Sequence, residues 1–593
     1  MKPDEQYAAR LAVYEARLTD LGRRDERIAS ARLVAALLFI VLVVANLTMP
    51  VAARWWWIVL PSVGFAWLVG RHTTVRRDRG RAARAAAFYR RGIDRIHDRW
   101  MGAGETGERF VDPHHVYAAD LDVFGRGSLF ELLSAARTRM GEQTLAQWLL
   151  SPAAAEEIRA RQAAVSELRP GLDLREDLEA AGEAGVGVRP DALLSWAESA
   201  NQLQASWIRP VALLLPGLAL LAALAWGLTG VRWPLLAVLL VEVAVILVLR
   251  DRLKGIADSA ESGFDNLRLL SALLTRIERE SFGAAALRSL QHQLTSQAQP
   301  ASRLMARLRL ITDLSGHRKN LLVQLFFELP LLYSVNVALA AEAWRARHGA
   351  AVRAWLSATG RFEALSSLAM YTYEHPDDPF PTFVAGAAIF EARELGHPLL
   401  PAATCVRNDV DIRAPVRVLL VSGSNMSGKS TLLRTVGVNI VLAMAGAPVR
   451  AAALALTPLQ VGASICVNDS LNQGHSRFYA EITRLRQLYE ISARGTALLF
   501  LLDELLQGTN SKDRRVGAEG VLREFIEQGA IGLISTHDLA LTDIAGNHPG
   551  ALRNVHFEDF FDEGRISFDF KLRDGIVTKS NGIELMRSIG LKV

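Results

Sequence analysis

RVLLVSGSNMSGKST, residues 417–431, is the stretch that decides the fold of this chain. Its first six residues are mostly apolar and β-branched, which predicts a buried strand, and apolar residues after Thr431 continue at helical spacing. The turn between strand and helix fits G-x-x-x-x-G-K-[ST] at every fixed position. Backbone N–H groups of such a turn curl around a phosphate at a helix N-terminus. The sequence therefore predicts a nucleoside-triphosphate site.

The residue types in this turn predict which groups contact the nucleotide. Lys429 is placed to reach the terminal phosphates, and the Ser430 hydroxyl is placed to bind Mg²⁺. The alternative is a glycine turn without a ligand, which explains the flanking strand and helix less well. The residues predicted to bind ATP here are Gly423, Ser424, Asn425, Met426, Ser427, Gly428, Lys429, Ser430 and Thr431.

Two acidic residues follow a second predicted strand. Residues 496–502 (TALLFLL) form a continuous apolar run typical of a buried parallel strand, and Asp503 and Glu504 come next. Acids commonly end strands, but behind a complete phosphate-binding turn this pair has a chemical use. We expect Asp503 to hold the metal with Ser430, and Glu504 to orient and deprotonate the attacking water.

Two further polar segments are candidates for the same site. Residues 530–536 predict another buried strand, and His537 follows it, where polar groups gather beyond strand ends. A lone histidine is often structural, but this position favours contact with the terminal phosphate, so Lys429, Glu504 and His537 are the predicted catalytic residues. Residues 474–478 (GHSRF) are either a polar turn or a second phosphate contact, made through Ser476 from a partner subunit.

Length and composition bound the remaining possibilities. A chain of 593 residues is expected to hold several domains. The 67 Lys and Arg residues nearly balance the 62 Asp and Glu residues, so net charge neither requires nor excludes nucleic acid. Two cysteines, Cys405 and Cys466, provide neither a disulfide framework nor a zinc set.

Four apolar runs predict two transmembrane hairpins. Residues 33–49 and 55–70 form one pair, and residues 211–229 and 233–249 form the other. Buried core helix pairs are the alternative. Seven arginines lie between Arg71 and Arg90, so the positive-inside rule places both termini and the segment 71–206 in the cytoplasm.

Two polar interruptions in apolar sequence need separate interpretation. Glu242 lies inside the fourth run, where a carboxylate is costly unless it is protonated or paired. A function is conceivable, although contact with a neighbouring helix is the simpler explanation. Residues 321–341 are also apolar, but Gln324, Glu328, Pro330 and Asn336 interrupt them, which favours a Pro-kinked helix in a soluble helical domain.

The predicted fold is multidomain. It combines a C-terminal α/β P-loop ATPase domain of ABC-like type, an all-α core with levers, and four transmembrane helices. From about Pro376, apolar runs alternate with helical patterns, as in a parallel sheet covered by helices. The predicted segments are an N-terminal helix 1–32, hairpins 33–70 and 207–250, a basic connector 71–110, helical core parts 111–206 and 251–375, and the ATPase domain 376–593.

These motifs together resemble those of MutS, the DNA mismatch-repair ATPase family, and within it a membrane-anchored bacterial branch. SGSNMSGKST is similar to the family's GPNMGGKST, DELLQGTNS to DEIGRGTST, and STHD to ATHY. VGASICVNDSLNQGHSRFYAEI resembles the stretch with the trans-acting signature serine, which implies that role for Ser476. The resemblance also covers ARTRMGEQTLAQWLLSP and GRFEALSSLA of the helical core.

The resemblance implies a homodimer with composite ATP sites, whose closure on ATP and Mg²⁺ moves the levers and clamps double-stranded or branched DNA. The chain departs from the family in three ways: it has no room before residue 110 for a mismatch-reading domain, Cys405 stands where an aromatic usually stacks on adenine, and no nuclease extension follows Val593. The implied location is the bacterial inner membrane, facing the cytoplasm. The alternative is an ATP-driven membrane signalling or transport-like switch with an unknown protein partner and no DNA.

Overall fold

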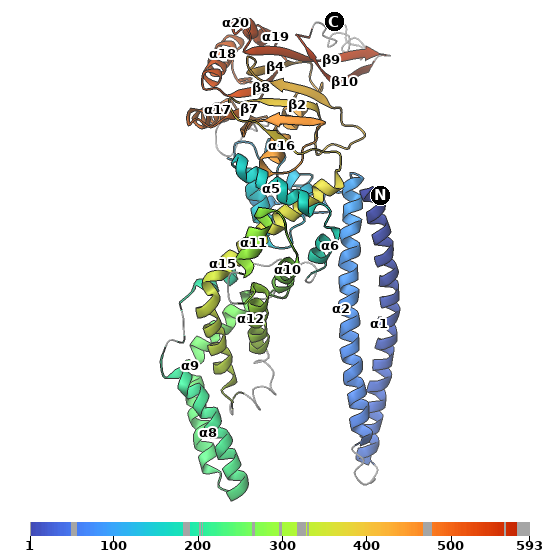
Figure 1. Cartoon of the computed structure of the whole chain (residues 1–593), viewed down its shortest axis with the longest axis vertical. Helices are drawn as coiled ribbons and strands as arrows, with labels where there is room; N and C mark the ends of the chain where they lie inside the picture. Colours follow the sequence, from blue (N-terminus) through green and yellow to red (C-terminus); the bar gives the residue numbers. More distant parts are fainter. Residues whose placement is uncertain are drawn as a thin grey trace.

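The computed structural model describes residues 2–577, except 49–55, 182–189, 201–202, 204, 264–266, 296–298, 317–327, 329–330, 466–476 and 563–564. The molecule consists of a head that contains the β-sheets, a helical middle part and two helical arms (Figure 1). Both arms extend away from the head in the same direction, and each is a pair of antiparallel helices. The N-terminus lies where the first arm joins the middle part.

The first arm is formed by α1 (Pro3–Thr48) and α2 (Trp56–Ile96). Each helix continues without interruption from a polar half into an apolar half, so the predicted boundary between residues 32 and 33 does not break α1. The reason is local: no proline lies between residues 4 and 49, so nothing forces the helix to end at the change in polarity. In the polar half, Leu21 of α1 packs against Val75 and Ala82 of α2.

The apolar half of the first arm exposes its side chains. Leu33 and Val34 are each 64% exposed and Trp67 is 67% exposed, because a pair of helices covers only the face along which they meet. Three described helices are long and apolar enough to cross a membrane by length and composition: Pro3–Ala45, Ile208–Thr229 and Trp233–Gly255. The fourth predicted span, 55–70, forms the start of α2 and is not among these candidates within the described residues.

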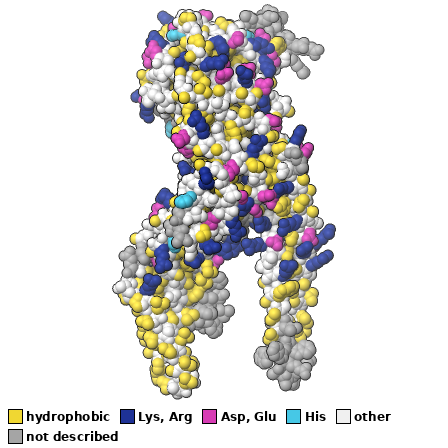
Figure 2. All heavy atoms as spheres, in the orientation of Figure 1, with side chains coloured by type: hydrophobic (Ala, Val, Ile, Leu, Met, Phe, Trp, Pro, Cys, Tyr) yellow, Lys and Arg dark blue, Asp and Glu magenta, His cyan; other side chains and the backbone are white. Residues whose placement is uncertain are grey.

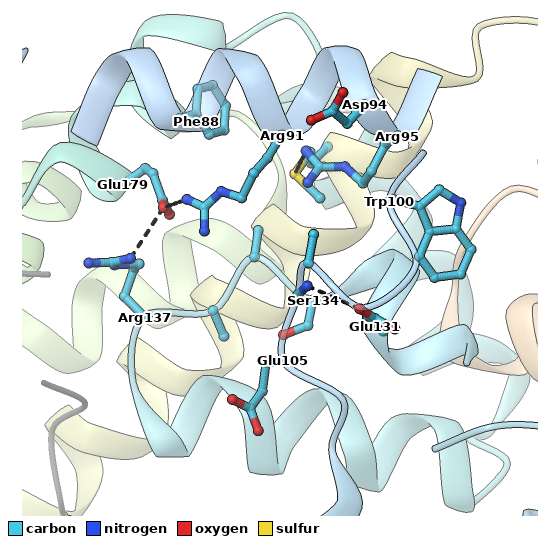
Figure 3. A pocket seen from close by; sticks show the side chains of 15 residues that line it. Phe88, Arg91, Asp94, Arg95, Trp100, Glu105, Glu131, Ser134, Arg137 and Glu179 are labelled. Atoms are coloured by element: carbon cyan, nitrogen blue, oxygen red, sulfur yellow. Dashed lines mark hydrogen bonds and ion pairs between the residues drawn. The ribbon is translucent and has the colours of Figure 1, made fainter. Parts of the chain in front are cut away.

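Buried charges fix the first arm to the middle part. Arg95 of α2 forms an ion pair with Glu374, whose side chain is 1% exposed, and Tyr7 of α1 donates a hydrogen bond to the same carboxylate at 3.2 Å. Arg91 and Arg137 converge on Glu179 beside a cavity of about 90 Å³ (Figure 3). Removal of one member of such a buried pair leaves the other charge uncompensated, so these contacts favour attachment of the arm to the middle part.

The second arm is formed by α8 (Ile208–Thr229) and α9 (Trp233–Gly263). Its base packs against the start of α15 (Tyr333–Glu374), where Leu249, Leu332 and Val335 belong to one buried hydrophobic cluster. Of the predicted kinked helix 321–341, residues 321–327 and 329–330 lie outside the described residues, and α15 includes residues 333–341. The carboxylate oxygens of Glu242, in α9, are buried without a hydrogen-bond partner among the described residues.

The head contains a six-stranded sheet in the order β10-β9-β4-β8-β7-β6. All neighbouring strands are parallel except β9 and β10, which are antiparallel. The fully buried β4 (Val418–Ser422) lies between β8 and β9 and is parallel to both. Its carboxyl end is therefore flanked by the carboxyl ends of these two strands. Helix α16 (Lys429–Ala445) follows β4 and packs against the sheet and against two helices of the middle part, α4 (Arg139–Leu150) and α5 (Ala155–Leu168).

The prediction of a parallel sheet from residue 376 onward was wrong for its first part. Residues 382–412 and 453–456 contribute a separate four-stranded sheet, β1-β5-β2-β3, in which β2 is antiparallel to both β3 and β5 and β1 is parallel to β5. Only short connections separate β1, β2 and β3, and antiparallel strands need no helical crossover. The apolar runs alone do not distinguish the two arrangements.

The remaining elements complete the middle part and the head. The middle helices are α3 (Leu129–Leu133), α4 (Arg139–Leu150), α5 (Ala155–Leu168), α6 (Leu172–Ala180), α7 (Pro190–Glu198), α10 (Leu267–Arg279), α11 (Ala285–Thr295) and α12 (Ala301–Gly316), with a 3₁₀ turn at Glu108–Phe110. The head has β1 (Thr382–Phe383), β2 (Phe390–Leu395), β3 (Asn408–Ile412), β5 (Ala453–Leu456), β6 (Gln460–Ser464), β7 (Leu498–Asp503), β8 (Ile531–Thr536), β9 (Leu552–Asp562), β10 (Arg565–Asp574), α17 (Arg477–Ala493), α18 (Ser511–Glu527), α19 (Leu539–Thr542) and α20 (Ile544–Asn547).

Candidate nucleotide site

The glycine-rich turn joins the carboxyl end of β4 to the N-terminus of α16. Gly423 has φ 151° and Gly428 has φ 101°, values that favour glycine. A Cβ atom added to Gly423 would lie 2.8 Å from the Ser427 hydroxyl oxygen and 3.2 Å from the Phe557 carbonyl oxygen, so a side chain there would require the loop to shift. Both glycines of the motif are therefore required by the path of the loop.

Lys429 closes the loop from inside. Its side chain is buried, and its ammonium donates hydrogen bonds to the carbonyl oxygens of Gly423 at 2.9 Å and Ser424 at 2.8 Å. Burial lowers the pKa of this ammonium, and the nearby carboxylates of Glu504 and Asp503 oppose that shift. A cation in this position can bind a phosphate that enters the loop.

Several polar atoms of the loop have no partner. The hydroxyl oxygens of Ser424 and Ser427 are buried without a hydrogen bond to a described residue. Buried polar atoms are usually hydrogen-bonded, so two buried hydroxyl groups without a partner fit a site for a polar ligand such as phosphate. Asn425 and Thr431 are exposed, and Met426, 85% exposed with φ 70°, forms the tip of the loop.

Asp503 lies at the end of β7 and faces the loop. Its carboxylate accepts a hydrogen bond of 2.6 Å from the Ser430 hydroxyl, and a second hydrogen bond from the Ser535 hydroxyl on β8. A serine hydroxyl beside a carboxylate suits Mg²⁺, which usually takes one or two protein ligands and completes its shell with phosphate and water. Among the described residues, no group of three His, Cys, Asp or Glu side chains could hold a metal without such additional ligands.

Glu504 and His537 face each other beside Asp503. The His537 Nδ1 atom lies 3.0 Å from the Glu504 Oε1 atom, and Gln507 contacts the other oxygen of the carboxylate. Glu504 has φ 53°, an uncommon value for a residue with a side chain, and Ser535 accepts hydrogen bonds from its N–H. The backbone thus turns the Glu504 carboxylate out of the line of the strand and toward His537.

Sequence reasoning missed part of the site. Ser535 fixes both acidic residues, and a serine within the otherwise apolar strand 530–536 was the available signal. Phe557 and Phe570 line a cavity of about 230 Å³ together with Gly428 and Thr431. The ring of Phe570 lies 3.2 Å from the position of an added Gly428 Cβ atom.

Cys405 and Ser476 differ from the other residues that the sequence analysis placed at the nucleotide site. The Cys405 sulfur accepts a hydrogen bond of 3.3 Å from the backbone N–H of His397, while its neighbours Thr404 and Val406 line the cavity. The aromatic wall of the cavity is thus provided by β9 and β10. Ser476 lies outside the described residues, and α17 begins at the next residue, Arg477.

The fold and the geometry of the site show a loop of the phosphate-binding type, which lies at the carboxyl ends of the strands of a largely parallel sheet. Comparison with protein families gives a more specific result: residues 419–592 match MutS domain V, and residues 117–186 match MutS domain III. These two matches support membership of the MutS family.

Individual relatives agree with the family match. The chain is 36% identical over 188 residues to a DNA mismatch repair protein MutS 2 of Halobacterium salinarum, a match that covers 31% of this chain and 21% of the relative. It is also 32% identical to two proteins called Endonuclease MutS2, and each match covers 34% of this chain. The matches cover 25% of the protein of Thermomicrobium roseum and 26% of that of Thermus thermophilus. The similarity thus spans about a quarter of each relative's length.

Proposed function

We propose that this chain is a membrane-anchored MutS-family ATPase, in which ATP binding and hydrolysis drive a dimeric clamp on double-stranded or branched DNA. The observation that carries the proposal is the convergence of Lys429, Ser430, Asp503, Glu504 and His537 around one glycine-rich loop. These residues come from a turn, a helix N-terminus and the ends of two parallel strands. Polar groups at such a strand edge are the usual binding groups of open α/β sheets.

Each residue has a distinct part in this proposal. Lys429 and the loop N–H groups bind the phosphates, and the cavity lined by Phe557 and Phe570 takes the base. Ser430 and Asp503 would hold Mg²⁺, which neutralises charge on the phosphates when bound. Glu504 accepts the proton of the attacking water, and His537 orients the Glu504 carboxylate through the contact of 3.0 Å.

The two arms support the membrane part of the proposal. Figure 2 shows hydrophobic side chains gathered on the outer part of the second arm and on the described outer part of the first, with Lys and Arg side chains nearer the middle part. An exposed apolar surface of this extent is unfavourable in water and favourable in lipid. With both arms in one bilayer, the head and the middle part lie on the arginine-rich side, which is the cytoplasm of a bacterial cell.

The dimer and the DNA substrate rest on the family. The names of the relatives include a DNA mismatch repair protein and endonucleases. Ser476 of one subunit would complete the ATP site of the other, and closure of the heads would move the middle helices. Direct reading of mismatches is not part of this proposal.

The decisive experiment is steady-state ATPase activity of the detergent-solubilised chain with homoduplex, mismatched and branched DNA across a salt series. Stimulation that depends on DNA structure and weakens with salt is the expected result, because phosphate contacts release counterions. Turnover indifferent to every DNA would refute the clamp.

A second candidate is an ATP-driven membrane switch that acts on a protein partner without DNA. The course of α15 favours it: Asn336, near the start, donates a hydrogen bond to the Ala212 carbonyl of the second arm, whereas Glu374, at the end, pairs with Arg95 of the first arm. One helix therefore contacts both arms and leads directly into the head. ATP turnover that responds to lipid composition but not to DNA would select this candidate.

A further inference from the structure

A polar cluster lies between α1 and α2 where their apolar halves begin. Asp25 is at its centre: the His72 Nε2 atom lies 2.7 Å from one carboxylate oxygen, and Arg79 lies 3.1 Å from the other. Arg76 approaches the same carboxylate at 3.8 Å, and Arg32 contacts the Nδ1 atom of His72. His72 is only 7% exposed, so the centre of the cluster is built into the helix pair.

The cluster has more positive charge than its own residues neutralise. Asp25 is the only carboxylate that these contacts involve: it pairs with Arg76 and Arg79, whereas Arg32 contacts His72 and not the carboxylate. The Nε atom of Arg32 is buried and has no hydrogen-bond acceptor among the described residues. An unpaired buried donor of this kind indicates a place for an anion.

The surroundings add to this imbalance. Residues 20–32 and 71–81 contain nine arginines and four Asp or Glu residues. Among the described residues, the other ion pairs of these arginines are Arg24 with Asp20 and Arg81 with Asp177, and both pairs lie outside the cluster. The nearby Arg23, Arg27 and Arg77 are exposed and form no ion pair with another described residue.

The position of the cluster identifies the source of the anion. Arg32 directly precedes the exposed Leu33, and its guanidinium lies 5.8 Å from the ring centre of Phe65 in the apolar half of α2. One side of the cluster is therefore apolar, whereas Arg76 and Arg79, 70% and 51% exposed, face solvent on the other. A phospholipid matches both sides, because its acyl chains suit the apolar side and its phosphate suits the arginines.

We propose that Arg32, Arg76 and Arg79, held by Asp25 and His72, bind the phosphodiester of an anionic phospholipid headgroup. The guanidinium groups present N–H donors in a planar fork that fits phosphate oxygens. The acyl chains of the lipid lie along the exposed apolar residues of α1. This site rests on the proposed insertion of the arms in a membrane, and it makes the first arm sensitive to the charge of that membrane.

The test is native mass spectrometry of the purified full chain with added phosphatidylglycerol or phosphatidylcholine. We expect the wild-type chain to retain phosphatidylglycerol at least tenfold more than phosphatidylcholine, and the variant Arg32→Gln/Arg76→Gln/Arg79→Gln to lose this preference. The matched control is Arg17→Gln/Arg81→Gln/Arg90→Gln, which also removes three positive charges but nearer the middle part. We expect this control to keep the preference for phosphatidylglycerol. Because the triple variant can disturb the arm, Arg76→Gln alone is measured too and reduces the preference several-fold.

Three results would overturn the site: equal retention of both lipids by the wild-type chain, an unchanged preference in the cluster variants, or equal loss in the control. Inorganic phosphate serves as a separate probe. If it displaces phosphatidylglycerol at low millimolar concentration, the cluster is a free-anion site and the lipid assignment is wrong. Carbonate extraction of the chain from cell membranes tests the proposed anchoring separately, so an anchored chain without lipid preference contradicts only this inference.

Discussion

At the residue scale, Lys429 has no substitute within the loop. Its ammonium is buried against two loop carbonyl oxygens, so Lys429→Ala removes the cation that meets the phosphates. We expect nucleotide affinity to fall at least tenfold, about 1.4 kcal/mol. Titration with a fluorescent ATP analogue measures it, and Lys512→Ala, an exposed lysine of α18, is the control. Equal affinities of the two variants would exclude Lys429 from the site.

Glu504 is expected to affect the chemical step and not binding. Glu504→Gln keeps the size of the side chain but removes the proton acceptor, so turnover should fall about 100-fold or more. Nucleotide binding should persist and trap the closed dimer, which phosphate release and mass photometry with ATP detect together. Glu527→Gln, at the exposed end of α18, is the control and keeps its turnover. A Glu504→Gln chain with normal turnover would contradict the assigned role.

At the scale of elements, α15 contains a buried carboxyl that makes stability depend on pH. Burial raises the pKa of Glu363 to about 7, although hydrogen bonds from Thr138 and the Arg137 N–H oppose the shift. Between about pH 4.5 and 7 the folded chain therefore binds more protons than the unfolded chain. Stability contributed by this group is present at low pH and falls as pH rises through that window.

The variant Glu363→Gln tests this pH dependence. Its side chain stays neutral, so the apparent Tm of the detergent-solubilised variant should change less between pH 5 and 7 than that of the wild type. Scanning fluorimetry at several pH values measures the difference. Glu490→Gln replaces an exposed carboxylate on α17 and should retain the wild-type slope. Identical slopes in all three chains would show that Glu363 does not ionise in this range.

At the scale of the whole molecule, the common direction of the two arms predicts the membrane topology. We replace Cys405 and Cys466 by serine and introduce Val231→Cys in the turn of the second arm or Ala9→Cys near the start of α1. In intact spheroplasts a membrane-impermeant maleimide should label Val231→Cys, while Ala9→Cys should react only after lysis. Both positions are exposed in the structure, so burial does not limit labelling. Labelling of Ala9→Cys in intact cells would reverse or exclude the topology.

The amino-acid sequence determined the features that depend on neighbouring residues. The strand, glycine turn and helix around residues 417–431 follow from local apolar patterning and from the backbone freedom of Gly423 and Gly428. The same holds for the strand that ends at Asp503 and for the long apolar helices. Each of these needs no information about which distant segment becomes its neighbour.

Only the tertiary structure decided the features that depend on pairing across the chain. The contact of Ser535 with Asp503 follows from the register of β7 and β8, and Phe570 reaches the loop because β10 pairs with β9 at the sheet edge. The antiparallel pairing of β2 with β3 and β5 and the Arg95–Glu374 pair arise in the same way. Local patterns specify which face of an element is buried, but the identity of the partner is set by long-range packing, which no local pattern contains.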